Sequence, residues 1–199
     1  WTAQLMTRLV QPNEWMRSHL DATARAMGLA AALESGPVIG MHVRHGDSCL
    51  EVEVARTCRE CEPLARYMEA IGPCAASTGA SAVCLATDSH DILERARADY
   101  PKYHFLALPN ISRSRASAPP TMVIDEVLRR RGDKGVAETH DELLASRVDM
   151  LLLARCKAFV GKFTSGLFRW AYALAAADAG GLPPFISLDA PWCSDYEIG

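Results

Sequence analysis

Residues 37–49 read PVIGMHVRHGDSC, and this stretch decides the fold class of the chain. Its continuous apolar run predicts a β-strand that is covered on both faces. The run ends in a cluster of polar and charged side chains, His42, Arg44, His45 and Asp47. Because ligands of α/β proteins gather at the carboxyl ends of the strands, this cluster indicates the edge of a ligand site.

Similar strands and intervening helices are expected along the rest of the chain. Further strands are predicted at SAVCLATD (81–88), YHFLAL (103–108), AFVGK (158–162) and PFISL (184–188). Helices are predicted at 63–71, 89–101, 139–156 and 164–180, with Ser89 as an N-cap and Gly180 as a stop. Alternating strands and helices favour an α/β fold with a mostly parallel sheet.

The first 36 residues are expected to form helices that pack on a domain spanning residues 37–199. Apolar positions at helical spacing in residues 1–29 predict two short helices, interrupted at Pro12, with Asn13 capping the second. A length of 199 residues suits one compact domain.

Composition argues against two classes of partner. A net charge of −3 provides no broad basic surface, so we expect no nucleic-acid partner. No apolar run reaches the roughly 18 to 20 residues that cross a bilayer. Because the chain begins at Trp1 rather than at a start methionine, we expect it to be a piece of a longer protein.

The seven cysteines divide into two groups. Cys84 and Cys156 stand in apolar runs and are predicted to be core thiols. The others include a cluster in a region predicted to be rich in loops, Cys49, Cys58, Cys61 and Cys74. That cluster fits one or two disulfides in an oxidising compartment. The CxxC spacing of Cys58 and Cys61 leaves a zinc site as the alternative.

A second polar cluster is predicted where the strand at 158–162 leads into a helix. Thr164, Ser165 and Gly166 stand at that helix start, where free N–H groups and the helix dipole favour an anion such as phosphate. Capping of the helix by Thr164 or Ser165 is the equally good alternative.

Arg44 and His42 lie two residues apart, so both project from one face if the strand stays extended. The guanidinium of Arg44 suits two phosphate oxygens, and an ion pair with Asp47 is the structural alternative. Asp149, in the long helix, is either a capping or exposed acid or an acceptor for the N1–H and 2-amino donors of guanine.

Four segments in this order resemble the α1,6-fucosyltransferase family, which includes the core fucosyltransferase of N-glycans and the nodulation fucosyltransferases. They are IGMHVRHGD (39–47), PLARYMEA (63–70), CLATDSHDILERARADYPKYHFLALPNIS (84–112) and DMLLLARCKAFVGKFTSGLFRWAYAL (149–174). The opening AQLMTRLVQPNEW (3–15) is also similar. The resemblance implies a Rossmann-like three-layer α/β/α domain, the C-terminal half of a GT-B glycosyltransferase, that binds GDP-fucose.

The resemblance also implies roles for individual residues. Arg44 would bind the β-phosphate and stabilise the GDP leaving group, with Glu51 or Glu53 as the catalytic base. The remaining donor-binding residues would be His42, Asp88, Asp149, Thr164, Ser165 and Gly166. Because Arg44 and the helix start supply positive charge, neither a metal nor another cofactor is expected.

The implied partners are a glycan or glycoprotein acceptor and the N-terminal half of the same enzyme, with homodimerisation through regions outside this chain. The implied location is the Golgi lumen, as part of a type II membrane protein. The chain departs from the animal members at His45, Ser48 and Gly166, which replace an arginine, a lysine and a glutamine. A donor-binding module without catalysis, or an α1,2 or protein O-linked fucosyltransferase, is therefore the alternative.

Overall fold

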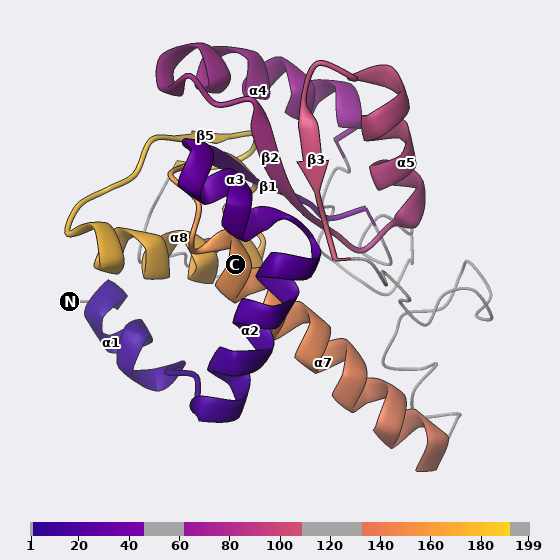
Figure 1. Ribbon diagram of the computed structural model, residues 1–199, viewed down its shortest axis with the longest axis vertical. Helices are drawn as coiled ribbons and strands as arrows, with labels where there is room; N and C mark the ends of the chain where they lie inside the picture. Colours follow the sequence, from indigo (N-terminus) through magenta and orange to yellow (C-terminus); the bar gives the residue numbers. More distant parts are fainter. Residues whose placement is uncertain (1, 46–61, 109–132, 192–199) are drawn as a thin grey trace.

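The computed structural model describes residues 2–45, 62–108 and 133–191 (Figure 1). Its centre is a five-stranded sheet, formed by β1 (Val38–Val43), β2 (Ala82–Thr87), β3 (His104–Leu106), β4 (Ala158–Gly161) and β5 (Phe185–Ser187). The strands lie in the order β3-β2-β1-β4-β5, and every neighbouring pair is parallel. The predicted α/β fold with a parallel sheet is confirmed.

Helices cover both faces of this sheet. They are α1 (Thr2–Leu9), α2 (Glu14–Ala26), α3 (Leu29–Ser35), α4 (Leu64–Thr78), α5 (His90–Asp99), α7 (Asp133–Leu153) and α8 (Gly166–Ala179). Figure 1 shows α4 and α5 on one side of the sheet and α2, α7 and α8 on the other, which gives three layers. Within the described ranges, no helix is long and apolar enough to cross a membrane.

The core follows from the alternation of side chains along each strand. In β1, Ile39 and Met41 pack with Leu64 and Ile71 of α4 on one face of the sheet. Val38 points to the other face, where it joins a second cluster with residues of α2, α7 and α8. Because both faces of β1 are buried, its sequence is a continuous apolar run rather than an alternating one.

The N-terminal region contains three helices rather than the two that the sequence predicts. Asn13 caps α2 as predicted, since its side-chain oxygen accepts the N–H of Met16 at 2.8 Å. The third helix, α3, follows Gly28, whose φ of 80° ends α2 and allows the chain to turn into a new helix. The division into residues 1–36 and 37–199 stays a prediction.

The cysteine predictions are confirmed at two positions and wrong at one. Cys84 and Cys156 are buried in the core. Cys74 is a free, buried thiol inside α4 and not part of a loop with a disulfide. The helix, predicted to span 63–71, continues through Pro73 to Thr78, and Ile71 and Cys74 both face the core. The other cysteines, Cys49, Cys58, Cys61 and Cys193, lie outside the described residues, and so does the CxxC pair of the zinc alternative.

Candidate functional site

The candidate site lies at the carboxyl edge of the sheet, where β1 and β4 are neighbours. From β1 the chain moves to β2 and β3 on one side, and later crosses back to β4 and β5 on the other. Such a switch point leaves a crevice between the loops that follow the two central strands. The loops after β1 and β4 carry Arg44 and residues 162–165, so two predicted groups of site residues meet at this edge.

Arg44 and Asp88 form the first part of the site. Nη1 of Arg44 lies 2.8 Å from Oδ2 of Asp88, and Oδ1 of Asp88 accepts the backbone N–H of His45 at 2.8 Å. The Asp88 side chain is 5% exposed and that of Arg44 is 39% exposed. A nearly buried carboxylate needs such partners. The alternative ion pair of Arg44 with Asp47 stays a prediction, because Asp47 lies outside the described residues.

The side chain of His42 projects from the face of β1 that α8 covers, near the same edge of the sheet. Its side chain is buried, and its ring stacks on that of Phe168 with centroids 6.3 Å apart and planes 17° apart. Phe168 belongs to the first turn of α8. The ring of His42 therefore joins the end of β1 to the start of α8.

The loop from β4 into α8 forms the second part of the site and holds Thr164, Ser165 and Gly166. Ser165 is the N-cap residue of α8, yet its side chain makes no capping hydrogen bond. The backbone N–H of Ser165 donates to the carbonyl of Lys162 at 3.1 Å. The next residue, Gly166, is exposed. The first N–H groups of a helix and its dipole together suit an anion, as the sequence predicts.

Three further acids were predicted to belong to the site, Asp149, Glu51 and Glu53. Asp149 is buried, 6% exposed, in α7, which packs against β2 and α8. Its proposed contact with guanine stays a prediction. Glu51 and Glu53, the two alternatives for the catalytic base, lie outside the described residues.

Sequence reasoning missed Asp189, which follows β5 at the same edge. Its carboxylate accepts hydrogen bonds from the N–H groups of Phe163 and Thr164, at 2.9 and 3.3 Å, and from the Thr164 hydroxyl. Partial burial works to raise the pKa of Asp189, but hydrogen bonds from Thr164, Ala190 and Ser187 outweigh it and lower this pKa. A signal was present, because Asp189 follows a predicted strand as Asp88 does.

Tyr67 is a second residue that the sequence did not single out as functional. It lies in the first turns of α4 and is 1% exposed. Burial raises the pKa of its hydroxyl, and the negative charges of Asp189, Glu62 and Asp88 raise it further. The raised pKa keeps the Tyr67 hydroxyl neutral at physiological pH.

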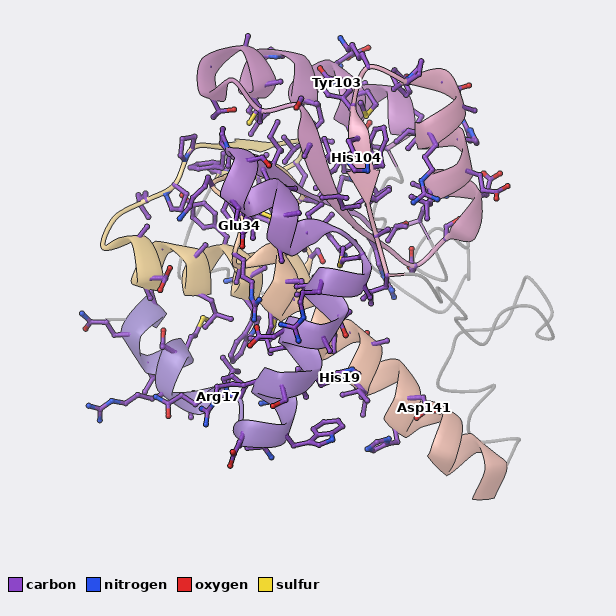
Figure 2. All side chains as sticks on the ribbon, viewed as in Figure 1. Arg17, His19, Glu34, Tyr103, His104 and Asp141 are labelled. Atoms are coloured by element: carbon purple, nitrogen blue, oxygen red, sulfur yellow. The ribbon has the colours of Figure 1, made fainter. Side chains whose placement is uncertain are left out.

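Other conspicuous polar residues lie away from this edge. Figure 2 labels Tyr103 and His104, which stand at the amino end of β3 and so at the opposite edge of the sheet. It also shows His19 on α2 and Asp141 on α7, in the layer of helices that contains α2, α7 and α8. A groove of about 650 Å³ between α1, α7 and α8 is lined by Arg8, Leu151 and other residues that belong to neither part of the site.

A parallel sheet with a guanidinium and a helix start at its switch point is typical of α/β proteins that bind phosphate-bearing ligands. The family described as alpha-(1,6)-fucosyltransferase N- and catalytic domains matches residues 1–190. The chain therefore belongs to the α1,6-fucosyltransferase family.

Individual relatives agree with this assignment. An alpha-(1,6)-fucosyltransferase of Drosophila melanogaster is 30% identical over 119 residues, covering 57% of this chain and 17% of the relative. NodZ alpha-1,6-fucosyltransferase co-crystallised with GDP is 25% identical with a TM-score of 0.51, covering 90% of this chain and 45% of NodZ. NodZ from Bradyrhizobium gives a TM-score of 0.53 at 22% identity, covering 91% of this chain and 46% of NodZ. The chain thus spans less than half the length of these relatives.

Proposed function

We propose that this chain is the donor-binding half of an inverting, metal-independent fucosyltransferase that moves fucose from GDP-fucose to a glycan through an α1,6 linkage. The observation that carries the proposal is the meeting of Arg44, paired with Asp88, and the start of α8 at the switch point of the sheet. Family membership supports the reaction class.

The two parts of the site suit the two ends of a pyrophosphate. Arg44 is held in place by Asp88 yet remains 39% exposed, so its fork is oriented before a ligand arrives. The N–H groups at the start of α8 offer further donors on the other side of the crevice. Asp149 would accept the guanine N–H groups, and His42 would contact the nucleotide.

In the proposed reaction, an acceptor hydroxyl oxygen attacks C1 of fucose as the bond from C1 to the β-phosphate oxygen breaks. The electron pair of that bond leaves with GDP, and the hydroxyl proton passes to a glutamate, either Glu51 or Glu53. Arg44 and the start of α8 stabilise the negative charge that develops on the departing phosphate.

The test is the replacement of Arg44 in the full-length protein. We expect Arg44→Ala to abolish transfer, and Arg44→Lys to lower it, because lysine keeps the charge but loses the two-pronged geometry. Asp88 needs a cationic partner, so the folded state of each variant is checked by thermal unfolding. Turnover near that of the wild type in a folded Arg44→Ala variant would contradict the proposal.

A donor-binding module without catalysis is the second candidate, because Ser48 and Gly166 replace a lysine and a glutamine of the animal members and two glutamates, Glu51 and Glu53, compete for the role of base. Calorimetry with GDP tests binding, and GDP release from GDP-fucose in the presence of glycan tests catalysis. Binding without acceptor-dependent release would favour the module. Transfer to chitobiose-core, galactoside and folded-protein acceptors separates the α1,6 linkage from the α1,2 and protein O-linked alternatives.

The same proposal includes the surroundings of the enzyme. The relatives are longer than this chain, which supports a partnership with an N-terminal half of the same protein. The proposed location is the Golgi lumen, and homodimerisation would use regions outside this chain.

A further inference from the structure

Asp189 stands two residues after the last residue of the short strand β5 and accepts hydrogen bonds from two segments of the chain. From the loop after β4, it accepts the N–H of Phe163 at 2.9 Å, the N–H of Thr164 at 3.3 Å and the Thr164 hydroxyl. From its own segment, it accepts the Ser187 hydroxyl at 3.1 Å and the N–H of Ala190 at 2.7 Å. One carboxylate thus ties the end of β5 to the loop that opens α8.

These contacts continue the pairing of β4 with β5 beyond the end of the sheet. The last backbone bond between the two strands runs from the N–H of Leu188 to the carbonyl of Gly161, at 2.9 Å. Two residues after the end of β4, the backbone N–H of Phe163 donates to the Asp189 side chain instead of to a strand carbonyl. Because Phe163 is fully buried, its N–H needs such an acceptor.

The residues at the start of α8 differ in their hydrogen bonds. Thr164 donates both its N–H and its hydroxyl to Asp189. Ser165, by contrast, makes no side-chain capping bond, and Gly166 has no heavy atom within 4 Å of where its Cβ would stand. An anion at this helix start therefore meets Ser165, Gly166 and the following N–H groups, while Thr164 faces Asp189.

A carboxylate so close to a phosphate site repels the ligand unless its charge is compensated. Hydrogen bonds hold the pKa of Asp189 below its ordinary value even though partial burial works to raise it, so the group is charged at neutral pH. The hydrogen-bond donors around the carboxylate stabilise its negative charge. Repulsion between this charge and a bound phosphate weakens donor binding, and the carboxylate offsets that loss if it keeps the loop in one conformation.

We propose that Asp189 is a positioning residue that fixes residues 163–165 for the pyrophosphate of the donor, and that Thr164 is its partner rather than a phosphate ligand. This inference rests on the proposed function, since it takes a nucleoside diphosphate as the ligand of the site. It adds a role for β5, a strand at the edge of the sheet, in donor binding.

The test compares variants of the full-length protein by calorimetry with GDP and with guanosine. Asp189→Asn keeps the size of the side chain but removes its charge and one of its two acceptor oxygens, so the bonds from Phe163 and Thr164 are weakened or lost. We expect the Kd for GDP to rise about tenfold, since bonds to a charged acceptor are lost. Guanosine lacks the pyrophosphate, so its Kd should stay within about twofold of the wild-type value.

A double-mutant cycle separates positioning from general damage. Thr164→Val removes the hydroxyl, and the double variant with Asp189→Asn should bind GDP no more weakly than Asp189→Asn alone. Thr164→Ser keeps the hydroxyl, so its Kd for GDP should be close to that of the wild type and lower than that of Thr164→Val. Asp178→Asn is the matched control, because it removes an equal charge from the exposed C-terminal end of α8.

Hydrogen exchange supplies a readout that needs no ligand. In Asp189→Asn, the amide protons of residues 163 and 164 should exchange faster, while those of β1 keep their rates. Any of four results would overturn the inference. They are unchanged exchange at residues 163 and 164, equal GDP binding by wild type and variant, additive losses of GDP binding in the double-mutant cycle, and equal weakening of GDP and guanosine binding. Failure of the wild type to bind GDP would instead overturn the proposed function, and the role of Asp189 in donor binding with it.

Discussion

Replacing Gly161 by alanine would drive a methyl group into the ring of Phe168. An added Cβ would stand 2.7 Å from Cε2 of Phe168 and 2.8 Å from its Cδ2 and Cζ, well short of the roughly 3.5 Å at which carbon atoms pack. Gly161 is the last residue of β4, immediately before the loop that opens α8. The clash therefore falls at the centre of the candidate site.

The ring of Phe168 has little room to move aside. It is fully buried, and its centroid lies 5.2 Å from that of Phe163 and 6.3 Å from those of Phe159 and His42. Overpacking of this kind costs about 1–3 kcal/mol. Alanine recovers about 0.5–1 kcal/mol of backbone entropy, so the net loss should be about 1–2 kcal/mol.

Urea unfolding of the full-length protein measures this loss. With an m value of about 1–3 kcal/mol per molar urea, the midpoint should fall by roughly 0.3–2 M. Gly181→Ala is the matched control, because an added Cβ there meets no heavy atom within 4 Å. Its midpoint should stay level or rise slightly. If Gly161→Ala and Gly181→Ala unfold at the same urea concentration, the argument that Phe168 is held in place is refuted.

Three further predictions address the site and its support. Asp149→Asn should raise the Kd for GDP about tenfold or more and reduce the preference for GDP over ADP in calorimetry, because a carboxylate accepts both guanine donors; an unchanged preference would remove Asp149 from the site. The pKa of Asp189 lies below the 3.8 of an unperturbed group, so its carboxylate stabilises the fold above that pH, and the stability is lost as pH falls through the lowered pKa. The difference in unfolding free energy between wild type and Asp189→Asn should therefore be constant near neutral pH and shrink below about pH 4; a difference that grows on acidification would reverse this sign. Arg155→Ala, which breaks the exposed pair with Asp21 at 2.8 Å, should lower stability by no more than about 1 kcal/mol in urea unfolding.

The strands were predictable from sequence because each leaves a local mark. β1, β2 and β4 are apolar runs, and the glycine after α8 adopts a φ of 67° as its predicted stop. Two predictions about helices were wrong. The helix predicted at 63–71 continues past Gly72 and Pro73 to Thr78, and Gly28 precedes a third helix that was not expected.

The partners within the site were harder to predict, because they depend on the order of strands. Arg44 pairs with Asp88, which is 44 residues away in the sequence and follows the neighbouring strand β2. Asp189 reaches Phe163 across 26 residues of chain. The position of Asp189 after a predicted strand was a signal, but nothing local in the sequence reveals that β5 lies beside β4, so its contact with the loop after β4 became visible only in three dimensions.

The strand order also sets a sequence of events during folding. The contact of Arg44 with Asp88 needs only β1 and β2, whereas the contact of Asp189 with Phe163 needs the late strands β4 and β5. A chain emerging from the ribosome can thus complete one part of the crevice well before the other. A ligand that bridges both parts binds only the finished sheet, and by mass action it would favour molecules in which the last strand has docked.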